Sequence, residues 1–110
     1  MLFVSGKSPF FDLTYKVYEF FTSSYEITSD VEVFHTNLSD DNALGFTEVN
    51  GEEQFVQVCN TLNERGFITT LLHELVHVVQ NEQGIIDETE RECEAYRLEE
   101  ILYNNYCANC

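Results

Sequence analysis

The stretch His73-Glu74-Leu75-Val76-His77 constrains the fold and chemistry of this chain more than any other part of its sequence. Residues 67–83 are predicted to form a helix, because they contain no Gly or Pro and their apolar residues recur at helical spacing. Residues four apart on a helix share one face and lie about one turn from each other. His73 and His77 are therefore expected to project from one side of a rigid element, with Glu74 beside them.

These three polar side chains have the chemistry of half a catalytic zinc site. Neutral imidazole nitrogens are ligands for zinc, and a neighbouring carboxylate can take a proton from a water that the metal activates. The pattern H-E-x-x-H is typical of metal-dependent peptide hydrolysis. The alternative is an amphipathic core helix with two polar His at its edge, although such a buried cluster without an ion carries a desolvation cost. The sequence predicts His73 and His77 as ligands of Zn²⁺ and Glu74 as the general base.

The third protein ligand is expected downstream, since a catalytic zinc usually has three protein ligands and one water. Gly84 is predicted to end the motif helix. A second helix is predicted to follow, because its apolar residues form a stripe and Asp87 or Thr89 can cap its start. If this helix packs across the first, it brings one of its carboxylates to the ion.

The combination H-E-L-V-H followed by E-x-E-A-Y, within residues 68–99, resembles the gluzincin group of zinc metallopeptidases, including its small bacterial and phage-borne members. In that group the third ligand is a Glu on the next helix, with a small residue three positions later. The resemblance implies Glu92 as this ligand, because Ala95 occupies the small position. Glu94 and Glu90 remain alternatives, and helical geometry also lets Glu94 face the motif helix. The family often has a polar residue four positions after the ligand to hold a ligand His, and Tyr96 departs from that pattern.

The rest of the sequence predicts an α+β fold in a single domain, residues 1–110, with the layout of a minimal zincin-like domain. An N-terminal helix is expected in residues 10–25, and strands are expected in residues 26–35, 45–49 and 54–59. Asn50-Gly51 indicates a hairpin between the last two strands. The predicted sheet is small and mainly antiparallel, and the motif helix and a C-terminal ligand helix follow it. Residues 54–59 are the candidate edge strand for an extended peptide, as in the resembling enzymes.

The charge of the chain limits its partners. Asp and Glu number 20 against 5 Lys and Arg, which gives a formal net charge of -15. Nucleic acids and anionic membrane surfaces attract cations, so neither is an expected partner. The acidic surface is interpreted mainly as solubilising, with attraction of a basic protein partner as the sharper hypothesis. No apolar leader segment or membrane-spanning stretch is visible, and a cytoplasmic protein is therefore expected.

Zinc-dependent hydrolysis of a peptide or protein substrate is the function that this sequence favours. The alternative is a non-catalytic, zinc-containing acidic protein that docks a basic partner. A third hypothesis, a metal-free acidic mimic of nucleic acid, predicts that the purified protein carries no zinc.

The remaining polar residues are assigned less directly. His35 is predicted to be a structural or surface residue rather than a metal ligand. Cys107 and Cys110 form a C-x-x-C without a second ligand pair in the sequence. Three tyrosines of the second helix (Tyr96, Tyr103 and Tyr106) are candidate donors to a reacting oxyanion, although tyrosines on a helix stripe usually belong to the core.

Overall fold

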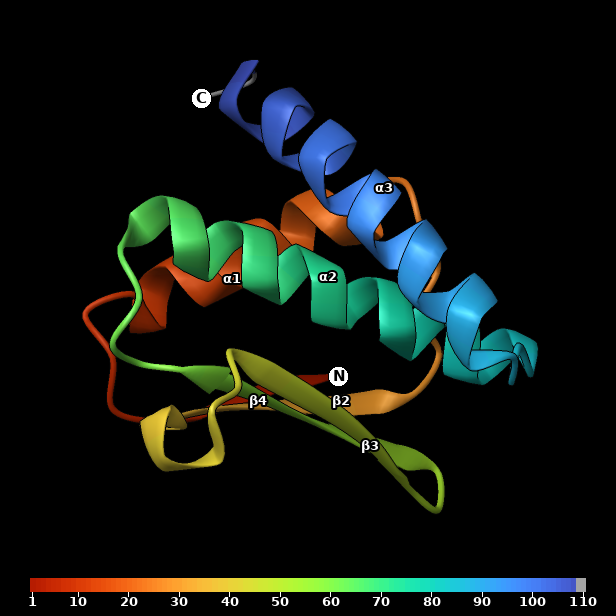
Figure 1. Ribbon diagram of the computed structural model, residues 1–110, viewed down its shortest axis with the longest axis horizontal. Helices are drawn as coiled ribbons and strands as arrows, with labels where there is room; N and C mark the ends of the chain where they lie inside the picture. Colours follow the sequence, from red (N-terminus) through yellow and green to blue (C-terminus); the bar gives the residue numbers. More distant parts are fainter. Residues whose placement is uncertain (109–110) are drawn as a thin grey trace.

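A computed structural model describes residues 1–108 of the chain, whose three α-helices pack on one face of a four-stranded sheet (Figure 1). The elements in chain order are β1 (Leu2–Gly6), α1 (Phe11–Thr22), β2 (Asp30–Thr36), a short 3-10 helix (Ser39–Asp41), β3 (Gly45–Asn50), β4 (Glu53–Cys59), α2 (Glu64–Gln83) and α3 (Glu88–Ala108). This arrangement confirms the predicted α+β class. None of the helices within residues 1–108 combines the length and the apolar character needed to cross a membrane.

The sheet is mixed, with the strand order β1-β2-β4-β3. β1 pairs with β2 and β2 with β4 in parallel, and β3 with β4 is the antiparallel pair. The expectation of a mainly antiparallel sheet is therefore wrong. The sequence analysis also missed β1 and placed a helix first. The crossover from β1 through α1 to β2 makes that pairing parallel, because a helical connection returns the chain to the same end of the sheet.

The hairpin between β3 and β4 is confirmed, but the expected edge strand is not. Gly51 has a φ of 66°, a conformation that Gly adopts without steric cost in a tight turn. Residues 54–59 belong to β4, which has a paired strand on each side. The other strand of the hairpin, β3, forms the end of the sheet. The alternate side chains Val56 and Val58 are fully buried beneath the helices, which fits an inner strand better than an edge.

α2 is the central element of the fold. The sheet covers one side of it, and α1 and α3 pack against its other sides (Figure 1). Leu71, Leu72 and Leu75 are fully buried, and each such burial stabilises the fold by roughly 1.5–3 kcal/mol. Asn63 caps the start of α2 by accepting a hydrogen bond from the Gly66 N–H at 2.8 Å. The site residues that α2 carries therefore lie on a rigid and well-anchored helix.

Two predicted helix ends agree with the structure. Gly84 ends α2 in a left-handed conformation with a φ of 73°. Asp87 caps α3, since its Oδ1 accepts a hydrogen bond from the Glu90 N–H at 2.9 Å. α3 then crosses the face of α2, with Ala95 fully buried in the core (Figure 1). This crossing brings the first half of α3 over the H-E-x-x-H segment.

Candidate metal centre

His73 and His77 on α2 and Glu92 on α3 meet where the two helices cross. Each residue offers one ligand atom, and these three atoms lie within 4.8 Å of one another. Glu92 Oε2 is 2.7 Å from His77 Nε2, and Glu92 Oε1 is 3.4 Å from His73 Nε2. The two Nε2 atoms are 3.1 Å apart. The structure thus brings together the three residues that the sequence analysis named as ligands.

The other two acidic candidates lie outside this cluster. Glu94 Oε1 accepts a hydrogen bond from Gln80 Nε2 at 2.9 Å. Glu90 is exposed in the first turn of α3. Glu92 is therefore the candidate that the helix crossing favours, and its role as the third ligand stays a prediction.

The ring nitrogens that face away from the cluster both have acceptor partners. His73 Nδ1 is 2.9 Å from Glu99 Oε1, and His77 Nδ1 is 2.8 Å from Gln80 Oε1. The amide of Gln80 is oriented by its nitrogen, which donates to the Arg91 carbonyl oxygen and to the Glu94 carboxylate. Each neutral imidazole therefore carries its proton on Nδ1.

This tautomer makes the cluster a good match for a cation. With Nδ1 protonated, the Nε2 lone pairs of His73 and His77 face each other and the carboxylate of Glu92. Three electron-pair donors at this separation repel one another unless a proton or a metal ion lies between them. Two imidazole nitrogens and one carboxylate are also a donor set that zinc takes in catalytic sites. The residues present therefore fit a zinc ion.

Glu99, Gln80 and Thr47 are site residues that were not predicted from the sequence. Glu99 follows Glu92 by two helical turns and so lies on the same face of α3. Gln80 follows His77 by one turn of α2, a spacing that was visible in the sequence. At the position where the resembling family often places a polar residue, the Tyr96 ring contacts the His73 ring edge-on, with centroids 4.7 Å apart. The carboxylate that holds His73 is that of Glu99, one helical turn after Tyr96 on α3.

Glu74 lies beside the cluster with its carboxyl held by the sheet. Its side chain is 6% exposed, and Thr47 Oγ1 on β3 donates to Glu74 Oε1 at 2.6 Å. Burial raises the pKa of Glu74 above its ordinary value, although the hydrogen bond from Thr47 and the two His side chains partly offset this effect. A carboxylate whose pKa is raised accepts a proton more readily than an ordinary carboxylate does.

Gly45 allows β3 to approach α2 this closely. A Cβ at this position would lie 3.0 Å from the Gln57 carbonyl oxygen, 3.1 Å from Glu74 Cγ and 3.1 Å from Thr70 Cγ2. Such contacts are shorter than side-chain carbon atoms normally make, so a side chain here pushes the strand away from the helix. The absence of a side chain at Gly45 thus sets the distance between Thr47 and Glu74.

The cluster opens into a cleft between β3 and α3. This cleft has a volume of about 590 Å³, and its walls come from residues 42–47, from one side of α2 and from the first half of α3. Tyr96 lines the cleft. Tyr103 stacks under the guanidinium of Arg65, and Tyr106 packs against Phe20, so both lie in other parts of the structure. Tyr96 is therefore the one of the three candidate tyrosines that the structure places at the site.

The remaining polar residues named from the sequence lie elsewhere. His35 is buried beneath α1, where its Nε2 is 2.9 Å from Thr14 Oγ1, and burial lowers its pKa. This placement agrees with a structural role. Cys107 is exposed near the end of α3, and Cys110 lies outside the described residues.

Comparison with known protein families, with curated proteins and with solved structures finds no match. The case for a function therefore rests on the geometry of the His73, His77 and Glu92 cluster and its surroundings.

Proposed function

We propose that this protein is a zinc-dependent peptidase, a minimal zincin-like domain of the gluzincin type. The observation that carries the proposal is the convergence of His73, His77 and Glu92 at the crossing of α2 and α3, with Glu74 buried beside them. A ligand set on two packed helices is pre-organised, since neither helix has to move to complete it. The adjoining cleft gives a substrate access to the site.

His73, His77 and Glu92 would hold the zinc ion. When bound there, zinc polarises a carbonyl oxygen and lowers the pKa of a water. Glu99 and Gln80 keep the two imidazole rings oriented, because each accepts the Nδ1 proton of one ring. This support leaves both Nε2 atoms directed into the site.

Glu74 would serve as the general base. It takes a proton from the attacking water and returns it to the leaving amine, so one carboxyl serves both halves of the reaction. The hydrogen bond from Thr47 fixes the orientation of this carboxyl, and its buried position keeps its pKa above the ordinary value. Proton transfer requires both the fixed orientation of the Glu74 carboxyl and its raised pKa.

β3 would bind the substrate in an extended conformation. It is the end strand of the sheet, so within residues 1–108 one side of its backbone has no strand partner, and its first half lines the cleft. Extended peptides bind such edges by adding a strand. Leu44, which precedes β3 and is exposed, offers an apolar contact at the rim of the cleft. Peptide or unstructured protein is the substrate class that suits this geometry.

Metal analysis and a cleavage assay on the same preparation test the proposal. The purified protein should bind about one zinc per chain and cleave a denatured, unstructured protein. A chelator should abolish the cleavage, and added zinc should restore it. A protein that binds no zinc after gentle purification and zinc addition would contradict the proposal.

A non-catalytic zinc-containing protein that docks a basic partner is the second candidate. The net charge of -15 and the acidic outer face of the sheet favour it. The two candidates differ in turnover, since both predict bound zinc but the second predicts that no peptide bond is cleaved in any substrate.

A further inference from the structure

None of the described helices covers the outer face of the sheet. All three helices lie on the opposite face, as Figure 1 shows. Successive side chains of a strand alternate between the two faces. The buried Val31, Val33, Val56 and Val58 point to the helices, so their neighbours in the sequence point outward.

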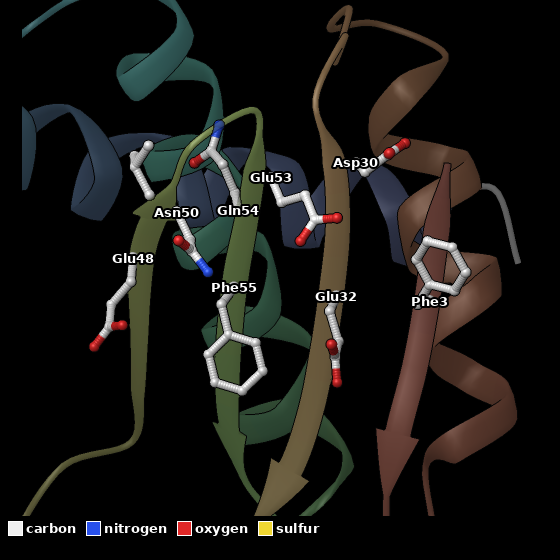
Figure 2. Close-up of a pocket in the computed structure, with 9 residues that line it drawn as sticks. Phe3, Asp30, Glu32, Glu48, Asn50, Glu53, Gln54 and Phe55 are labelled. Carbon is white, nitrogen blue, oxygen red and sulfur yellow. The ribbon is translucent and has the colours of Figure 1, made fainter.

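The outward side chains form an ordered row across all four strands. The pairing register places Phe3 beside Glu32, Glu32 beside Phe55 and Phe55 beside Glu48. Aromatic rings and carboxylates therefore alternate from β1 to β3, one strand spacing (about 4.8 Å) apart. Figure 2 shows these four side chains on the same face of the sheet. We call them the aromatic–acid row.

A second set of acidic groups adjoins this row. In the register of the strands, Asp30 on β2 lies beside Glu53 on β4, and Glu53 lies beside Asn50 on β3. Together with the row they line a hollow of about 500 Å³ (Figure 2). Phe3 is 52% exposed, so its ring is open to contact with a partner at the edge of this hollow.

Among the described residues, no Lys or Arg side chain forms an ion pair with the carboxylates of this face. The four strands contain no Lys or Arg. Asp30 pairs with the N-terminal ammonium group at 3.1 Å, and Glu32 accepts a hydrogen bond from Ser5. Within residues 1–108, Glu48 and Glu53 have no ion pair. The carboxylates of Glu32, Glu48 and Glu53 are thus left without a cationic partner among the described residues and can pair with an outside cation.

We propose that the outer sheet face docks a basic segment of a partner protein, with arginine side chains lying across the aromatic–acid row. A guanidinium group is planar, stacks on aromatic rings and pairs with carboxylates through two hydrogen bonds. The alternation of Phe3, Glu32, Phe55 and Glu48 offers both contacts to one such group. Lysine offers the charge without the flat stacking surface, so the face selects arginine over lysine.

Charge excludes two other occupants of the face. A second copy of this chain would bring a net charge of -15 against the same acidic surface, which repels it. Nucleic acid would place phosphates against Glu32, Glu48 and Glu53, which is equally unfavourable. A basic protein segment is the occupant that complements both the charge and the rings.

This docking surface is separate from the candidate metal centre. The metal ligands lie on the helix side of the sheet, and the aromatic–acid row lies on the other side. Binding to the row should therefore persist in a His73→Ala variant that has lost zinc. The proposal can fail or hold whether or not the protein is a peptidase.

The test measures the binding of a fluorescein-labelled peptide of alternating Arg and Ser by fluorescence anisotropy at about 0.15 M salt. The triple variant Glu32→Gln, Glu48→Gln, Glu53→Gln should bind the peptide at least about tenfold more weakly than wild type. The matched control Glu19→Gln, Glu26→Gln, Glu90→Gln has the same change of charge at exposed positions outside the sheet. The affinity of this control variant for the peptide should fall by less than about threefold. Equal losses in the two triple variants would overturn the proposal, because they would show attraction by net charge alone.

Two further measurements test whether the peptide contacts the aromatic rings and where on the protein it binds. The wild type should bind the Arg peptide about fivefold more tightly than the matching Lys peptide, and Phe3→Leu should reduce this preference. Amide shifts in ¹⁵N spectra should change on β1 to β4. Shifts confined to the cleft between β3 and α3, or self-association that the face triple variant abolishes, would assign the surface to another role and overturn the proposal. Circular dichroism melts of each variant confirm that it is folded.

Discussion

Removal of the Glu99 carboxylate should weaken zinc binding without removing a ligand. Glu99 Oε1 lies 2.9 Å from His73 Nδ1, and the Glu99 side chain is only 16% exposed. A hydrogen bond to a charged group is worth about 1.5–3 kcal/mol, and partial exposure favours the lower end of that range. Since about 1.4 kcal/mol corresponds to a factor of ten, Glu99→Ala should raise the dissociation constant for zinc by about 10- to 30-fold. That range agrees with the usual effect of losing a partner of a ligand His.

The adjacent residue provides the control for this prediction. Glu100 has a 57% exposed side chain and pairs with Arg65 at 3.4 Å, so Glu100→Ala removes the same charge one position away. Its zinc affinity should change by less than about twofold, since an exposed pair contributes little. Competition with a chromophoric chelator measures both affinities. If Glu99→Ala and Glu100→Ala bind zinc equally well, Glu99 does not support His73 and the orientation argument is wrong.

Three further predictions concern stability and access to the site. Glu82 accepts hydrogen bonds from the backbone and hydroxyl groups of Thr28 and Ser29, so Glu82→Gln should lower the free energy of unfolding by about 1–2 kcal/mol in urea titrations. Although burial raises the pKa of Glu82, these bonds hold it below its ordinary value of 4.5, so the stabilisation is present above that value and should fade as the pH falls through the lowered pKa. If the difference in the free energy of unfolding between Glu82→Gln and wild type does not shrink in acid, the stabilising role of the Glu82 carboxylate is wrong. Gly45→Val should displace β3 from α2 and lower both cleavage and the melting temperature; unchanged values would show that the strand tolerates a side chain there. Chelation of zinc should lower the melting temperature of the wild type, because bound metal contributes folding free energy, and an unchanged melt would count against a bound ion.

The features predicted correctly from the sequence depend on local signals. The motif helix, its end at Gly84, the Asp87 cap of α3 and the hairpin at Asn50-Gly51 each follow from a few neighbouring residues. Such signals act within one turn of helix or one tight turn of chain, so no knowledge of the tertiary structure is needed. The positions of His73 and His77 on one face of α2 follow from the same local geometry.

The features that were missed depend on contacts between distant segments. β1 gains its stability from parallel pairing with β2, about 30 residues later, and five residues of strand carry little signal alone. The order of β3 and β4 in the sheet depends on which strand meets β2. Glu99 could not be assigned to His73 before the crossing of α2 and α3 was known, because a Glu on a helix is most often a solvated charge.

The most direct test of the proposed peptidase compares wild type with Glu74→Gln in zinc content and in cleavage of an unstructured protein. Gln keeps the shape of the side chain but cannot accept the proton, and Glu74 is not a ligand in the proposed site. Both proteins should therefore contain about one zinc per chain, and cleavage by Glu74→Gln should fall by a factor on the order of 10² or more. Equal cleavage by the two proteins would show that Glu74 is not the base. Zinc-loaded wild type that cleaves nothing across a broad peptide library would contradict the peptidase itself.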